Sequence, residues 1–66
     1  MKRRYVIGAV VRDTTKVAPS EFGRVVGFGR NDHNELTVLV QWEFSGTRRL
    51  EKPYCTFVLP SDIVLL

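Results

Sequence analysis

Apolar and polar residues alternate most regularly in the middle of the chain, between Leu36 and Phe44. This period of two predicts a β-strand with one face turned toward a core. Leu39 breaks the pattern, because it places an apolar side chain on the otherwise polar face, and it indicates a second layer or a partner on that side. The residues expected on the apolar face are Leu36, Val38, Val40, Trp42 and Phe44.

Two extended segments are predicted before this strand. The first, over Tyr5–Asp13, is expected to point Ile7 and Val11 inward, with Gly8 at a bend or bulge. The second, over 23–30, contains three glycines. Glycines inside a strand mark bulges, tight bends or close backbone approach, so a strongly curved sheet is expected here.

Turn-forming residues separate these segments. Residues 14–22 have no useful period and predict a loop, in which 20–23 can form a single helical turn that returns Phe22 to the core. The polar run 31–35 predicts a hairpin turn, because Asn and Asp tolerate left-handed backbone and bond their own amides. Ser45-Gly46 predicts the next turn.

The last third of the chain predicts two more strands. A segment beginning at Thr47 is interrupted by Pro53, which cannot donate to a sheet ladder, so this part is expected at a sheet edge or in a loop. Pairing is expected to resume over 54–59. Residues 60–62 predict a short helical turn, and 63–66 a final strand. The residues expected to share one face are Cys55, Phe57 and Leu59.

These elements predict an all-β fold, a small five-stranded and strongly bent barrel with a short helical turn before the last strand. A chain of 66 residues forms one domain, 1–66, and buries only about 60% of the surface that its unfolded form exposes. One cysteine and one histidine allow neither an internal disulfide nor a four-ligand zinc site, so we expect no metal or cofactor. No run approaches the roughly 20 apolar residues of a membrane span, and a lone thiol fits a reducing compartment, so a cytoplasmic protein is expected.

The net charge of +3 is unevenly distributed, with +4 in residues 1–33 and −1 in residues 34–66. A basic balance of this kind either favours a polyanionic partner or keeps a small domain soluble. The two basic clusters are Lys2, Arg3 and Arg4, and Arg48, Arg49 and Lys52.

The order of the segments 6–11, 23–27, 38–42 and 59–66 resembles the SH3-like barrel group. That group includes Tudor and KOW modules, small barrel subunits of photosystems and of ferredoxin-thioredoxin reductase, and type II dihydrofolate reductases. The resemblance covers most of the chain and implies the fold, whereas members of the group have unrelated functions.

Three members of the group imply different functions. The type II reductases share the strand over 23–28, but their late Val-Gln-Ile-x-Pro segment has no counterpart, because Val40-Gln41-Trp42 lies in the wrong strand and 57–60 lacks the glutamine. Tudor modules imply a cage of aromatic side chains that binds a methylated cation. In this chain most aromatic residues are expected in the core, which leaves few for such a cage. KOW modules imply nucleic-acid binding through basic loops and exposed aromatics.

We therefore expect a non-enzymatic binding module with no small-molecule substrate and no membrane partner. His33 lies in a polar turn, where an exposed imidazole is expected. A catalytic Cys55 would need a nearby base, and His33 is the single histidine that could serve, so neither residue indicates catalysis. The favoured hypothesis is a protein partner or self-association, and the alternative is nucleic-acid binding. The first would use Leu39, Val26 and Tyr54. The second would use Lys2, Arg3, Arg4, Arg48, Arg49, Lys52 and Tyr54.

Overall fold

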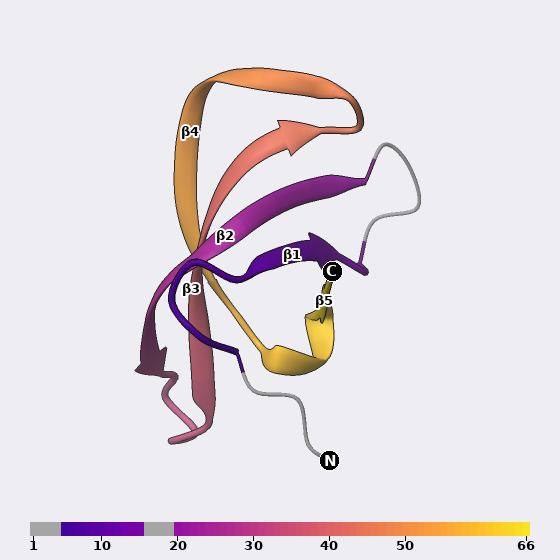
Figure 1. Cartoon of the computed structure of the whole chain (residues 1–66). Helices are drawn as coiled ribbons and strands as arrows, with labels where there is room; N and C mark the ends of the chain where they lie inside the picture. The colour runs from indigo at the N-terminus through magenta and orange to yellow at the C-terminus, as the bar shows by residue number, and fades with distance from the viewer. Residues whose placement is uncertain (1–4, 16–19) are drawn as a thin grey trace.

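The computed structural model describes residues 5–15 and 20–66, and its five strands form one antiparallel sheet (Figure 1). The strand order in the sheet is β4-β3-β2-β1-β5, so the last strand returns to pair with the first. These strands confirm the all-β prediction, and the 3₁₀ turn η1 confirms the expected helical turn before the last strand. The elements are β1 (Val10–Asp13), β2 (Glu21–Arg30), β3 (Leu36–Ser45), β4 (Arg48–Val58), η1 (Pro60–Asp62) and β5 (Ile63–Leu65).

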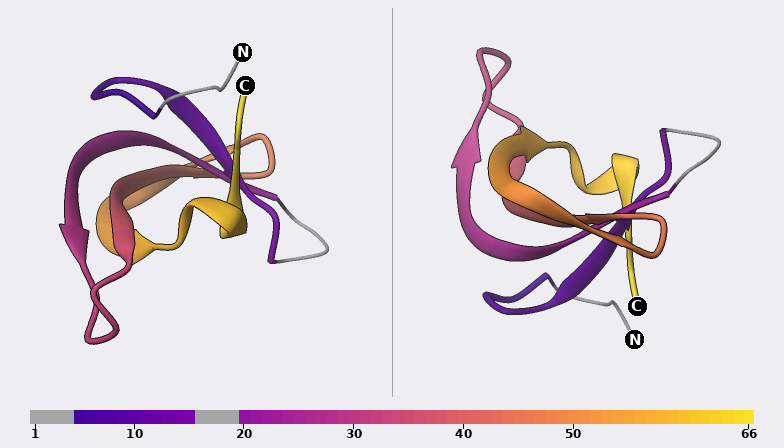
Figure 2. Two further views of the ribbon diagram at one scale, coloured as in Figure 1. Left: turned by 90° about the horizontal axis from the view of Figure 1, so that it is seen from below. Right: turned by 90° about the horizontal axis from the view of Figure 1, so that it is seen from above.

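The sheet is strongly curved, and the two views of Figure 2 show β2, β3 and β4 bending along their length. Irregular pairing accompanies this bend. The register between β2 and β3 shifts between Phe22 and Gly23 and again between Val25 and Gly27. Such bulges increase the local twist and bend a strand. In the described ranges, no helix is long and apolar enough to cross a membrane.

The core is small and consists mostly of valine. Trp42 is its largest side chain and is only 2% exposed, and its indole N–H donates a hydrogen bond to Thr56 Oγ1 at 2.7 Å. β5 follows η1 directly and contributes Ile63 to the core. The buried apolar residues are Val11, Val25, Val38, Val40, Trp42 and Ile63.

β4 is an edge strand, as predicted, and continues through Pro53. Its pairing with β3 stops after Arg49 and resumes at Tyr54, as predicted. The prediction that Cys55 and Phe57 share one face is confirmed, and both side chains are exposed. Tyr54 pairs with the core residue Trp42, so the alternation places Cys55 and Phe57 on the opposite face.

The predicted first strand is too long, because β1 begins only at Val10. Gly8 has a φ of 91° and lies in a turn closed by the bond from the Ala9 amide to the Val6 carbonyl, 3.0 Å long. The chain reverses there, so the alternation does not continue through it. Ile7 is 62% exposed and does not point inward.

The segment before β2 also differs from the prediction. Glu21 and Phe22 belong to β2, so no helical turn forms over 20–23. The predicted loop over 14–22 is therefore shorter, and its residues 16–19 lie outside the described ranges.

The polar turn between β2 and β3 is confirmed. Asn31 Oδ1 accepts bonds from the His33 and Glu35 amides at 2.9 and 3.0 Å, and Asn34 has a φ of 60°.

Candidate binding surface

The face of the sheet that is turned away from the core, here called the outer face, carries two different groups of side chains. In β1, Val11 and Asp13 are buried. Because side chains alternate along a strand, Val10 and Arg12 lie on the outer face. The pairing between strands then carries this assignment across the sheet. One group is cationic and aromatic, and the other is apolar.

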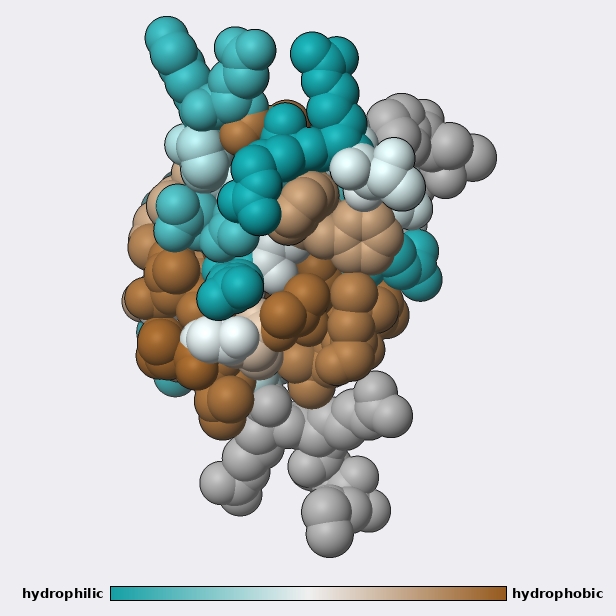
Figure 3. Space-filling model, turned by 45° about the horizontal axis from the view of Figure 1, so that its top comes forward, coloured by the Kyte–Doolittle hydropathy of each residue, from teal (hydrophilic) through white to brown (hydrophobic). Residues whose placement is uncertain are grey.

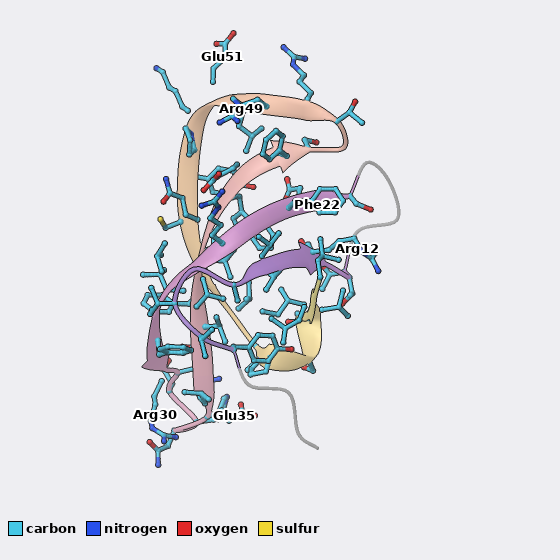
Figure 4. All side chains as sticks on the ribbon, viewed as in Figure 1. Arg12, Phe22, Arg30, Glu35, Arg49 and Glu51 are labelled. Atoms are coloured by element: carbon cyan, nitrogen blue, oxygen red, sulfur yellow. The ribbon has the colours of Figure 1, made fainter. Side chains whose placement is uncertain are left out.

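The cationic and aromatic group is a single row of directly opposed residues on four neighbouring strands. Arg12 pairs with Phe22, Phe22 pairs with Phe44, and Phe44 pairs with Arg49. The Arg49 guanidinium lies 4.8 Å from the centroid of the Phe44 ring, within the range of a cation–π contact. Figure 4 shows Arg49, Phe22 and Arg12 following one another across β4, β2 and β1. We call Arg12, Phe22, Phe44 and Arg49 the cation–aromatic row.

Phe44 reaches this row because the sheet is irregular at Glu43. Simple alternation along β3 predicts Phe44 on the core side with Trp42. Gly23 pairs with Trp42 and Phe22 with Phe44, which leaves Glu43 as an extra residue between them. The extra residue resets the alternation, so the prediction that Phe44 faces the core is wrong. Phe44 is only half-buried.

A shallow pocket of about 170 Å³ adjoins the row. Its charged members are Arg24, whose side chain is 61% exposed, and Glu43, and the two are 3.9 Å apart. In this weak ion pair, Arg24 offsets the negative charge of Glu43. Arg12 and Arg49 at the two ends of the row therefore give the region a net positive charge. The pocket is lined by Val10, Gly23, Arg24, Glu43 and Phe44.

The apolar group lies on the same face, nearer the β2–β3 turn. Leu39 pairs with Gly27 on one side and with Phe57 on the other. A Cβ added at Gly27 would lie 3.5 Å from Leu39 Cδ2, and one at Gly29 would lie 2.9 Å from Phe57 Cε1. Leu39 and Phe57 therefore lean over positions that have no side chain.

Other exposed apolar residues extend this group. Val26 lies at the bulge next to Gly27, and the turn that contains Val6 and Ile7 is held to β2 by the bond from the Gly8 amide to the Val25 carbonyl, 2.8 Å long. On the side drawn in Figure 3, polar side chains stand at the top and apolar ones gather across the lower half. We call Val6, Ile7, Val26, Leu39 and Phe57 the outer apolar surface; all are exposed except Leu39, which is half-buried.

The structure separates the residues predicted to bind a protein. Leu39 and Val26 belong to the outer apolar surface. Tyr54 lies on the opposite face, because it pairs with Trp42, and its hydroxyl donates a hydrogen bond to Glu21 Oε1 at 3.2 Å.

The residues predicted to bind nucleic acid are divided as well. Arg48, Arg49 and Lys52 are exposed on β4, and Arg49 alone of these three belongs to the cation–aromatic row. Tyr54 again lies on the other face. The remaining cluster of Lys2, Arg3 and Arg4 lies outside the described residues.

The sequence analysis did not predict that Arg12, Phe22 and Phe44 lie next to one another on the surface. They are far apart in the chain, and only the strand register places them in one row. Among residues 5–15 and 20–66, no three His, Cys, Asp or Glu side chains are grouped closely enough to hold a metal ion.

Comparisons with protein-family models, with curated proteins and with solved structures find no match to this chain. The two surfaces of the outer face are therefore interpreted from their own chemistry.

Proposed function

We propose that this protein is a non-enzymatic, SH3-like binding module that holds another protein against the outer apolar surface. The fold part of the proposal is supported by the strand order β4-β3-β2-β1-β5 and by η1 before the returning β5. The cytoplasmic location predicted from the sequence belongs to the same proposal.

The observation that carries the proposal is a group of exposed apolar side chains on the outer face. Ile7 and Phe57 are 62% and 59% exposed, in a chain whose whole accessible surface is 4966 Å². Single exposed apolar residues are ordinary, whereas a contiguous group of them marks an interaction site. Within it, Leu39 and Phe57 are a directly opposed pair.

Charge favours a different protein over a second copy. The outer apolar surface itself carries no charge, and Arg24 on the same face is largely exposed beside Glu43. Two copies with a net charge of +3 each repel one another. A partner with an apolar centre and an acidic margin complements both the surface and its surroundings.

The test compares two substitutions on the same strand. Leu39→Glu places a charge within the outer apolar surface, and Leu36→Glu makes the same change at an exposed position that pairs with Arg30, outside that surface. Partners captured by the wild-type protein are purified and titrated against all three proteins by calorimetry. We expect Leu39→Glu to abolish binding and Leu36→Glu to retain it.

Two results contradict the proposal. Equal binding by the Leu39→Glu and wild-type proteins would show that the partner docks elsewhere. Sedimentation equilibrium that gives a dimer of the wild-type protein, dissociated by Leu39→Glu, would assign the surface to a second copy. The emission of Trp42, which is buried in the core, confirms that each variant is folded.

A further inference from the structure

The cation–aromatic row is a second surface that the protein partner proposed above does not explain. Its members come from β1, β2, β3 and β4, and they are brought together by three consecutive strand pairings. We propose that the row binds single-stranded nucleic acid, with bases stacked on its planar groups and phosphates held by its arginines.

The spacing of the row suits such a ligand. Neighbouring strands lie about 4.8 Å apart, so the row places two aromatic rings between two arginines over about 14 Å. Phe22 and Phe44 are both half-buried and directly opposed, so each ring is held by the sheet while part of it stays accessible. Aromatic rings and guanidinium planes are the groups on which unpaired bases stack.

Arg49 and Phe44 already form a stacked cation–π contact, and a base could stack on it as a further planar group. The guanidinium lies over the ring at 4.8 Å, which holds the charge at a fixed position on an exposed strand. A guanidinium held in this way presents a planar surface to a base, and its N–H groups can also reach a phosphate.

The electrostatics around the row favour a polyanion. Arg12 and Arg49 stand at its two ends, and Arg24 lines the adjoining pocket beside Glu43. Exposed Arg48 adds positive charge next to Arg49 on β4, diluted by Glu51. An acidic peptide would satisfy the arginines but would not use the accessible parts of the two rings, so the rings favour nucleic acid.

The experiment titrates the protein into a labelled oligothymidine of about 12 nucleotides, and into a duplex of the same length, and follows fluorescence anisotropy at low and near-physiological salt. We expect the single strand to bind more tightly than the duplex, with an affinity that falls as salt rises, because counterions are released from the phosphates. Phe44→Leu keeps an apolar side chain but removes the ring, and it should weaken binding by about fivefold or more.

A pair of charge substitutions tests the position of the site. Arg49→Gln and Lys52→Gln each remove one exposed positive charge from β4, but only Arg49 belongs to the row. Arg49→Gln should weaken binding and lower the magnitude of the salt slope by about 0.7, the value of one phosphate contact in a single strand. Lys52→Gln should leave the slope of the wild-type protein nearly unchanged.

Several outcomes would overturn the inference. Equal binding of duplex and single strand, or no effect of Phe44→Leu, would remove the stacking role. Equal losses in Arg49→Gln and Lys52→Gln would mean diffuse charge instead of a built site. Displacement of the oligonucleotide by a polyglutamate peptide at similar concentration would assign the row to acidic peptides. Leu39→Gln, which disrupts the outer apolar surface without adding charge, should leave oligonucleotide binding unchanged, so the two proposals can fail separately.

Discussion

At the scale of single residues, Gly23 is the position where the backbone leaves least room. A Cβ added there would meet the Gln41 carbonyl oxygen and would lie 2.8 Å from Val40 Cγ1. The obstacle is backbone on a neighbouring strand, which cannot move without distorting the ladder. Gly27 differs, because its added Cβ would only touch the Leu39 side chain at ordinary contact distance.

We therefore predict that Gly23→Ala lowers the free energy of unfolding by about 2 kcal/mol, the cost of overpacking a close-packed site. Gly27→Ala is the matched control, and we expect a change within about 0.5 kcal/mol, because no neighbouring atom has to move. Urea denaturation followed by Trp42 fluorescence measures both. Equal destabilisation by the two substitutions would contradict the close approach at Gly23.

These glycines also show what the sequence can and cannot predict about single residues. Glycines in a strand indicated bulges or close approach, and the register shifts beside Gly23 and Gly27 bear this out. The partner of each glycine could not be predicted, because it depends on which strand lies opposite and in which register. Phe57 leaning over Gly29 is such a contact, between residues 28 positions apart in the chain.

At the scale of elements, the edge strand β4 pairs with β3 in two separate stretches. Its ladder with β3 is interrupted opposite Glu43, so Arg49 and Tyr54 are its nearest paired residues on the two sides of the gap. The indole N–H of Trp42 bonds Thr56 Oγ1 across this same pair of strands. The side-chain bond therefore ties the second half of β4 to the core.

We predict that Thr56→Val lowers the free energy of unfolding by about 1–2 kcal/mol, because it keeps the shape of the side chain but leaves the buried indole N–H without its acceptor. Thr56→Ser retains the hydroxyl and should lose less than half as much. Thermal unfolding followed by circular dichroism gives both values. If valine and serine have the same effect, the hydroxyl does not contribute.

The element scale is also where sequence reasoning failed most clearly. The existence and order of the strands could be predicted, because alternation and turn residues are local properties. The face on which Phe44 lies could not be predicted. The extra residue at Glu43 changes the alternation, and nothing in the neighbouring sequence indicates it. Alternation did predict that Cys55 and Phe57 share a face, but it does not say which face of an edge strand is covered.

At the scale of the whole molecule, the two ends of the described chain depend on one another. Tyr5 donates a hydrogen bond through its hydroxyl to the Pro60 carbonyl at 3.0 Å, and β5 pairs with β1. Ile63 is 3% exposed and is the residue of β5 that enters the core. The last strand is thus part of the single core and not an appendage.

Because of this, we predict that Ile63→Ala destabilises the whole molecule by about 2–5 kcal/mol, the usual cost of truncating a buried isoleucine. A chain of this length has a total stability of only about 3–10 kcal/mol, so this loss removes a large share of it. Ile63→Val should cost about 1 kcal/mol. Leu66→Ala, at a 68% exposed position in the same segment, should have almost no effect and serves as the control.

Circular dichroism and Trp42 fluorescence distinguish a global effect from a local one, because the tryptophan lies on β3, away from the substituted strand. In Ile63→Ala both signals should be lost together at a lower denaturant concentration than in the wild-type protein. An unchanged unfolding midpoint, with faster amide exchange confined to residues 63–66, would instead mean that β5 frays independently. The row and the outer apolar surface would then not require β5, whereas cooperative unfolding means that both surfaces depend on the returning strand.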